Sequence, residues 1–461
     1  MKLKHLFAGA LGLGLASSSV FAQTTEITIT GATAFRQATV RAIYNAYNSV
    51  PGGLGTSFNV AHDFTGNNLS QLIASNKAVF SGQFPGITGT TVIRTAFNGS
   101  TEGLNAIAGN NNPAFLTTGA LGTTGTIEGG KSGPTENLRP KFSFSDVFQS
   151  TSPVDNEVLE PVGASAVGVV TFAMVANDGA PSNWTNVTIQ QCRALWQAGF
   201  LPLSIFTGDP ADTTLVFATG RNDGSGTRSA YLTEWLYGAA NLVKQVVATA
   251  NGVNASAPYN VPATEIQKLT LVPLGGTGTG ELATSGGASN NSTLWLNNAV
   301  GNGGYSSSSA LRDHMGRTTA NVTVYDGIST DEPIVEDAPI HLLTWLSTAD
   351  SRNAAAANAK ILAFNGVQVT PLASSTDPSN YLSSGFNQAD FEKIATGAYS
   401  AWSYQHLYHH GSLSTVEQFW RDEMTKPDGY LEVGLQQTAN GLRLSDMAVE
   451  RADDGFPIFS L

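Results

Sequence analysis

The sequence predicts two α/β domains, and three observations lead to that fold class. The chain has 461 residues, more than one hydrophobic core usually organises. Both halves repeat the order of a β-rich stretch, a turn of small residues and an amphipathic helix, which is typical of α/β folds. The run 166–176 (AVGVVTFAMVA) is almost continuously apolar, as expected for a strand buried on both faces. We expect this run to cross between the two domains.

The N-terminus has the pattern of an export signal. Lys2 and Lys4 precede a short apolar run over 6–15, and residues 20–22 (VFA) form a small-residue cleavage pattern before Gln23. We therefore predict a signal peptide over 1–22, without a cysteine for lipid attachment. No later apolar run reaches the ~18 residues that a membrane span needs. The mature protein is expected in the periplasm or outside the cell, and not spanning the membrane.

Charge and cysteine content exclude some classes of function. With 23 basic and 35 acidic residues the formal net charge is -12, which argues against nucleic acid as a partner. The single cysteine, Cys192, rules out an intramolecular disulfide. It lies in a helical pattern with Leu195 and Trp196, so we interpret it as a buried apolar thiol. Local backbone dipoles can still bind a small anion in an acidic protein.

The most specific motif is the septet Arg221-Asn222-Asp223-Gly224-Ser225-Gly226-Thr227. A strand over 213–218 is expected before it, and a helix continuing to about 246 is expected after it. The two glycines allow a sharp bend and a close approach to a ligand. Ser225 is a predicted N-cap, which directs the unpaired amides of the first helical turn into the loop. Together with Arg221 these groups predict an anion site; the alternative is a capped turn with a solvated arginine.

Three other turns deserve comparison with the septet. A strand over 26–30 leads through Gly31 and Ala32 to Thr33 and a helix, and a strand over 91–97 leads to Ser100 and another helix. Residues 109–139 are rich in Gly, Thr, Asn and Pro and are interpreted as an inserted loop. A strand over 142–148 then carries Asp146. Taken singly, Thr33 is an ordinary helix cap and Asp146 a turn residue.

The C-terminal third is expected to contain helices around 340–346 and around Trp402. His406, His409 and His410 lie in one aromatic-rich stretch, but no carboxylate cluster or His-Glu-x-x-His spacing accompanies them. We interpret them as packing residues and expect no metal site and no cofactor. The sequence also lacks a Gly-x-Ser-x-Gly elbow, so we do not expect an enzyme.

In this order, the turns at 31–33 and 99–101, the pair Ser145-Asp146 and the septet resemble those of periplasmic phosphate-binding proteins. These proteins are the substrate-binding subunits of phosphate ABC transporters. The stretches 361–371 and 397–402 are similar to further segments of that family. The resemblance implies a two-lobed type II periplasmic binding protein fold, with a ligand cleft between lobes joined by crossover segments. Lobe 1 would comprise 23–170 plus 310–461, and lobe 2 would comprise 171–309.

The resemblance also implies roles for individual residues. Inorganic phosphate would be the ligand, and a permease complex of an ABC transporter is a candidate partner of a protein that we expect to be a monomer. Asp146 would be the acceptor, Arg221 the charged contact and Asp223 its orienting partner. The other implied phosphate contacts are hydrogen-bond donors. Lobe 1 would supply Thr33 and Ser100, and lobe 2 would supply Ser225, Gly226 and Thr227.

Asp146 does most to narrow the ligand. Phosphate near neutral pH keeps at least one P–OH, which a buried carboxylate can accept, whereas sulfate has no proton to offer. A site with a placed polar partner can reject an analogue that lacks the matching group by ~10⁴-fold. Three alternatives stay open: a binding protein for sulfate, molybdate or tungstate, an exported surface protein that keeps the fold without transport, and an exported hydrolase. Three departures from the family are the long insert, the greater length of the chain with its extended C-terminal region, and Glu102, which we expect to point away from the anion.

Overall fold

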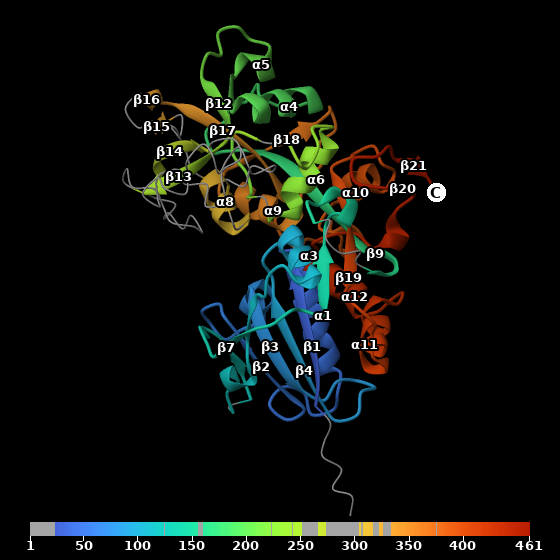
Figure 1. Ribbon diagram of the computed structural model, residues 1–461. Helices are drawn as coiled ribbons and strands as arrows, with labels where there is room; N and C mark the ends of the chain where they lie inside the picture. The colour runs from blue at the N-terminus through green and yellow to red at the C-terminus, as the bar shows by residue number, and fades with distance from the viewer. Residues whose placement is uncertain are drawn as a thin grey trace, which may run out of the picture.

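The computed structural model shows a mixed α/β protein built as two bodies (Figure 1). It describes residues 24–123, 125–154, 160–222, 224–241, 243–250, 266–272, 304–305, 308–316, 322–325, 333–374 and 376–461. The predicted signal peptide and Asp223 lie outside these residues. The α/β class predicted from the sequence is confirmed. Among the described residues, no helix has the length and apolar character needed to cross a membrane.

The first body is organised around β1 (Thr24–Gly31). This strand pairs in parallel with β4 (Thr90–Ala96) on one side and with β8 (Phe142–Ser145) on the other. The sheet continues beyond β4 through β3 (Lys77–Gly82) and β2 (Phe58–His62). Because β1, β4 and β8 run the same way, their carboxyl ends meet at one edge of the sheet. Each of the three predicted first-lobe contacts follows one of these ends.

A single long strand, β9 (Glu160–Ala176), links the two bodies. Its first part pairs antiparallel with β19 (Trp402–His409), and its last part pairs with β17 (Ile340–Ser347) and β18 (Lys360–Phe364). The result is one sheet whose main path runs from β11 (Phe200–Pro202) and β12 (Leu215–Ala218) through β17, β9, β19, β8, β1, β4, β3 and β2 to β6 (Ile127–Glu128). Residues 168–176 are all buried, and Val170, Met174 and Val175 have 0% exposure. The strand predicted over 166–176 is therefore confirmed.

The second body surrounds β12 (Leu215–Ala218), which runs parallel to β17 and antiparallel to β11 (Phe200–Pro202). Its helices include α4 (Ile189–Ala198), α6 (Gly226–Glu234), α8 (Ser308–Met315) and α9 (Thr348–Ala356). A separate four-stranded sheet consists of β13 (Gln245–Ala250), β14 (Ile266–Val272), β15 (Val322–Tyr325) and β16 (Pro333–Ala338). The lobe boundaries stay a prediction, although β15, β16, β17, α9, β18 and most of α8 fall in the predicted lobe 1 and lie with the second body here (Figure 1).

Several secondary-structure predictions were wrong. Residues 340–346, expected as a helix, form β17, and Trp402 begins the strand β19. The helix after the septet ends at Glu234 instead of continuing to 246. The insert over 109–139 contains the short strands β5 (Ala114–Leu116), β6 (Ile127–Glu128) and β7 (Thr135–Asn137). A short apolar run such as IHLLTWLS has no period that separates a buried strand from a buried helix, and here sheet pairing decides.

The C-terminal helices complete the covering of the sheet. They are α10 (Gln388–Ala395), α11 (Thr415–Thr425) and α12 (Tyr430–Thr438), and α12 packs along α1 (Arg36–Asn48). In the second body, Trp196, Tyr231, Trp235 and Trp345 form a buried aromatic cluster with ring centroids 4.5–6.4 Å apart. Cys192 is buried beside this cluster, as predicted.

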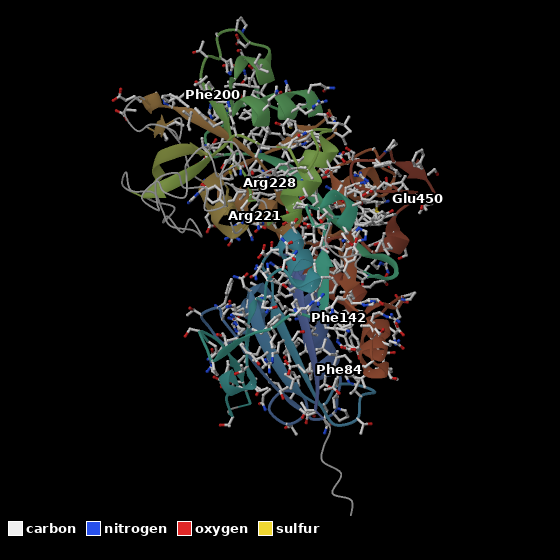
Figure 2. The ribbon with its side chains drawn as sticks, viewed as in Figure 1. Phe84, Phe142, Phe200, Arg221, Arg228 and Glu450 are labelled. Carbon is white, nitrogen blue, oxygen red and sulfur yellow. The ribbon has the colours of Figure 1, made fainter. Side chains whose placement is uncertain are left out.

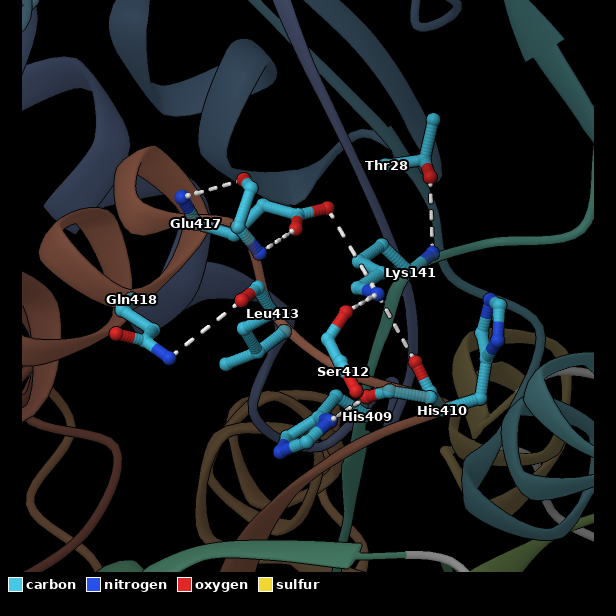
Figure 3. A network of polar contacts seen from close by, with 10 residues as sticks. Thr28, Lys141, His409, His410, Ser412, Leu413, Glu417 and Gln418 are labelled. Atoms are coloured by element: carbon cyan, nitrogen blue, oxygen red, sulfur yellow. Dashed lines mark hydrogen bonds and ion pairs between the residues drawn. The ribbon is translucent and has the colours of Figure 1, made fainter.

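A polar network fixes the end of β19 to the start of β8 (Figure 3). The Lys141 Nζ donates hydrogen bonds to the carbonyls of His410 (3.0 Å) and Ser412 (2.8 Å) and lies 3.9 Å from a Glu417 oxygen. The Lys141 amide donates to Thr28 Oγ1 at 2.9 Å. One lysine thus joins β1, the start of β8, the loop after β19 and the first turn of α11.

Candidate functional site

The site begins at the sheet edge where β1, β4 and β8 end. The Ala32 amide donates to the Phe144 carbonyl (2.8 Å), and the Gly99 amide donates to the Gly31 carbonyl (3.0 Å). Gly31 has φ +110°, and a Cβ there would collide with the Phe144 backbone. These contacts bind the three loops into one surface. Helix α3 (Ser100–Ala108) starts on this surface and lies next to α6 of the second body (Figure 1).

One buried contact between the two bodies converges on Asp146. The Ser100 hydroxyl donates to Asp146 Oδ1, and the Asp146 amide donates back to Ser100 Oγ (3.2 Å). From the other body, the Thr227 hydroxyl donates to Asp146 Oδ2 at 3.2 Å. All three residues are buried, with 1% of Ser100 and of Asp146 exposed. The structure therefore brings together three predicted contacts, and here the carboxylate itself receives the hydroxyl donors.

The backbones of the two bodies also touch at this point. The Glu102 amide donates to the Gly224 carbonyl at 3.1 Å. A Cβ on Gly226 would collide with the Asp146 carboxylate and the Ser100 side chain, and a Cβ on Gly99 would collide with the Gly224 carbonyl. These glycines permit close approach between the bodies. The carboxylate of Glu102 accepts a hydrogen bond from Asn111, which belongs to the insert.

Residues 225–227 of the septet form the start of α6, as predicted. Ser225 is the N-cap, and its hydroxyl accepts a hydrogen bond from the Arg228 amide at 3.4 Å. Gly226 and Thr227 are the first two residues of the helix, so their amides belong to the group without intrahelical partners. The N-cap prediction is confirmed, and it puts the positive end of the α6 dipole beside Asp146.

Thr33 takes a different position from the one that its motif suggested. It is half-buried in the turn after β1, and the N-cap of α1 is Phe35, which makes no side-chain capping bond. The expectation that Thr33 caps this helix is wrong. Among the described residues, Thr33 shares the sheet edge with Ser100 and Asp146 but makes no hydrogen bond to either.

Arg221 is buried with 1% exposure, in the body opposite the Asp146 loop (Figure 2). Its Nε donates to the Tyr305 carbonyl at 2.9 Å, and its Nη1 donates to the Ser308 hydroxyl. Burial lowers the pKa of Arg221 to about 10, while the charges of Asp350 and Asp146 oppose this shift. The guanidinium therefore stays cationic near neutral pH. Sequence reasoning missed Tyr305, Ser308 and Asp350, which lie far from the septet in the chain and carry no local motif.

The protonation of Asp146 is set by competing effects. Burial raises the pKa of Asp146, and the hydrogen bonds from Ser100, its own backbone amide and Thr227 lower it, together with the charge of Arg221. Hydrogen bonds to the ionised form are what keep a buried carboxylate charged. The same donors would stabilise an anionic ligand in the same place.

The histidine stretch belongs to the core of the first body. His406 and His409 are buried on β19, where His406 packs on Phe148 with ring centroids 4.2 Å apart and His409 packs on Phe142 at 6.2 Å. Burial lowers the pKa of His406 to about 3, so its ring is neutral at physiological pH. The interpretation of these two histidines as packing residues is confirmed. Within the described part of the chain, no group of three or more His, Cys, Asp or Glu side chains is arranged to hold a metal ion.

No family model and no curated protein matches this sequence. Solved structures to which the chain is similar include an ABC-type phosphate transport receptor from Vibrio cholerae (12% identity, TM-score 0.36, 88% of this chain and 94% of that chain). PstS from Borrelia burgdorferi (9% identity, TM-score 0.34, 90% and 97%) is similar too. So is a possible phosphate binding protein from Planctomyces limnophilus (10% identity, TM-score 0.33, 90% and 98%).

Proposed function

We propose that this protein is an exported solute-binding protein that holds inorganic phosphate between its two lobes. One observation carries the proposal: the buried Asp146 carboxylate accepts hydroxyl donors from both bodies, Ser100 from one and Thr227 from the other. The Arg221 charge reaches the same carboxylate. An acceptor, hydroxyl donors, a helix N-terminus and a buried guanidinium around one point form the set that a partly protonated tetrahedral anion needs.

The proposed binding event exchanges partners. Ser100 and Thr227 turn their hydroxyls from Asp146 to phosphate oxygens, and Asp146 accepts the P–OH of the ligand. Ser225 and Gly226 contribute amides of the α6 N-terminus, Arg221 contributes charge, and Thr33 completes the first-lobe side. Asp223 keeps its proposed role as a partner of Arg221. Each hydrogen bond to a charged group contributes about 1.5–3 kcal/mol, so a few suffice for tight binding in an acidic protein.

The wider biological role follows the same proposal. Binding without chemistry, in the periplasm or outside the cell, suits delivery of phosphate to the permease complex of an ABC transporter. The set of groups around Asp146 supports an oxyanion ligand, and the acceptor among them favours phosphate over sulfate, molybdate or tungstate.

Isothermal titration of the mature protein with phosphate and with sulfate tests the ligand. We expect binding of phosphate and no measurable binding of sulfate near neutral pH. The Arg221→Ala variant should weaken phosphate binding by at least ~100-fold, because it removes a charged contact from a buried site. The absence of heat with phosphate, or equal affinity for both anions, would contradict the proposed function.

Discrimination between the anions tests the role of Asp146 separately. The Asp146→Asn variant should mainly raise the relative affinity for sulfate, because an amide can donate to an oxygen that has no proton. An unchanged ratio of the two affinities would remove Asp146 from the ligand contacts. Asp422→Asn, a change of the same type at a largely exposed position, serves as the control.

A further inference from the structure

We propose that Ser308 and Asp350 are positioning residues that hold the Arg221 guanidinium in the orientation needed to meet the anion. This inference deepens the proposed function and rests on it for the identity of the ligand. The geometry that supports it lies on the side of Arg221 formed by α8 and α9, which no motif in the sequence had connected with the septet.

The backbone at Tyr305 is joined to the septet like a short strand. The Tyr305 amide donates to the Gly220 carbonyl (2.9 Å), and the Asn222 amide donates to the Tyr305 carbonyl (3.1 Å). These two bonds form a parallel bridge between Arg221 and Tyr305. The same Tyr305 carbonyl accepts from Arg221 Nε at 2.9 Å. The Arg221 Nε is therefore bound to the carbonyl of a residue whose backbone is held by two hydrogen bonds to the septet strand.

Tyr305 is held at its other end as well. Its hydroxyl is 2.6 Å from His314 Nδ1, and its ring packs edge-on against the His314 ring with centroids 5.0 Å apart. Both residues are buried, with 1% and 2% exposure. His314 lies in α8, the helix that starts with Ser308. Arg221 thus contacts Tyr305, which His314 holds from α8, and Ser308, the first residue of the same helix.

Asp350, in the next helix, is bound to the helix that carries Ser308. It lies in the first turn of α9, accepts from the Ser347 hydroxyl (3.2 Å) and forms an ion pair with Arg312 of α8 (3.5 Å). Among the charges around Arg221, Asp350 is the largest that favours the cationic form, ahead of Asp146, whereas Arg36 disfavours it. The charge of Asp350 offsets part of the cost of burying the guanidinium.

These contacts hold the Arg221 side chain in place before the anion binds. Rotamer freedom of a long arginine is costly to lose at the moment of binding, and an arginine that is already held loses less. Ser308 fixes the fork of the guanidinium, and Asp350 pairs with Arg312 on the helix that carries Ser308. Neither residue needs to touch the anion.

The first experiment compares Ser308→Ala with Ser308→Thr, which keeps the hydroxyl, and with Ser351→Ala as the control. Ser351 is a buried serine of α9 whose hydroxyl donates to the Thr348 carbonyl of its own helix and, among the described residues, to no other group. We expect Ser308→Ala to weaken phosphate binding about tenfold, the effect of one hydrogen bond to a charged group. Ser308→Thr should restore most of the affinity. Equal affinities of Ser308→Ala and Ser351→Ala would overturn the role of Ser308.

A second readout is independent of phosphate. In ¹⁵N NMR of the ligand-free protein, the Arg221 Nε–H signal reports whether the side chain is held. Ser308→Ala should shift this signal and speed its hydrogen exchange, and Ser351→Ala should leave it unchanged. If the native protein binds no phosphate, the proposed function fails while this measurement still decides whether Ser308 holds Arg221. An unchanged signal in Ser308→Ala would overturn the inference even if phosphate binds.

Asp350 is tested against a matched aspartate. Asp313 also pairs with Arg312, at 2.7 Å, but its side chain is 52% exposed. We expect Asp350→Asn to weaken phosphate binding and Asp313→Asn to leave it unchanged within about twofold, because an exposed pair is screened by water. Equal effects of the two variants would show that Asp350 has no special relation to Arg221 and would overturn its assignment.

Discussion

At the scale of single residues, burial controls the protonation of carboxyl groups in this protein. Asp454 illustrates it outside the proposed site, with only 3% of the residue exposed. Its carboxylate accepts from the Phe148 amide (2.8 Å) and from the Thr151 hydroxyl, just after the Asp146 turn. Burial is the largest cause that raises the pKa of Asp454 to about 7, despite these hydrogen bonds.

This shift predicts a pH-dependent stability. A carboxyl whose pKa is higher in the folded than in the unfolded state stabilises the fold below its unfolded pKa, and loses this contribution as the pH rises through the folded value. For Asp454 the window runs from the ordinary aspartate pKa of 3.8 to about 7. Replacement by asparagine removes the ionisation and should flatten this part of the profile.

The measurement is chemical denaturation of the native protein and of Asp454→Asn between about pH 4 and pH 8. We expect the free energy of unfolding of the native protein to fall relative to the variant as the pH rises, by a few kcal/mol in order of magnitude. A constant difference across the range would show that Asp454 titrates normally. Asp422→Asn, at a 63% exposed side chain, should give no such slope.

At the scale of elements, capping residues set where a helix starts, and packing of its apolar face then sets its orientation. Helix α4 starts with a complete capping box: the Thr188 hydroxyl accepts from the Gln191 amide (3.3 Å), and the Gln191 side chain accepts from the Thr188 amide (2.8 Å). This helix carries Cys192 and Trp196 into the core of the second body.

Loss of this cap predicts a defect in stability without a defect in binding. Thr188→Ala should lower the free energy of unfolding by about 1 kcal/mol, because the Gln191 amide loses its acceptor. Thr188→Ser keeps the hydroxyl and should recover most of it. Phosphate affinity, measured by titration of the folded proteins, should be the same in all three. Weaker binding in Thr188→Ala would mean that α4 takes part in the site.

The elements also show where sequence reasoning works. The Ser225 cap, the buried strand β9 and the strand-to-helix turns were predictable because each depends on neighbours in the chain: turn residues, a cap and an apolar run. The strands β17 and β19 were not, because their apolar runs fit either a strand or a helix until sheet pairing decides. The contacts of Arg221 with Tyr305 and Ser308 join residues 84 and 87 positions apart, so no local pattern could indicate them.

At the scale of the whole molecule, the two bodies meet through backbone as well as side chains. Gly226 is the tightest point, because a Cβ there would collide with the Asp146 carboxylate and with Ser100. Gly224, two residues earlier, offers a matched comparison. A Cβ at Gly224 would make only ordinary contacts of 3.5 Å or more, with Glu102 and Asn222.

Small-angle scattering should therefore separate two alanine variants of the same loop. Gly226→Ala is expected to keep the bodies apart, with a larger radius of gyration than the native protein and weaker phosphate binding. Gly224→Ala should keep the native radius, because its added methyl group finds room. If Gly226→Ala were as compact as the native protein, the bodies would not depend on this contact for their arrangement.

The position of Asp146 has a kinetic consequence. Its carboxylate already accepts hydrogen bonds from the Ser100 and Thr227 hydroxyls. Phosphate can therefore bind these donors only after their hydrogen bonds to Asp146 have broken. Uptake then follows a step inside the protein, and its observed rate should level off as the phosphate concentration rises instead of increasing without limit. Because Asp146 is part of the protein, it competes with phosphate at a fixed effective concentration. This competition raises the concentration of free phosphate that is needed for binding. Asp146, the residue proposed to recognise phosphate, therefore also competes with it for the same hydroxyl donors.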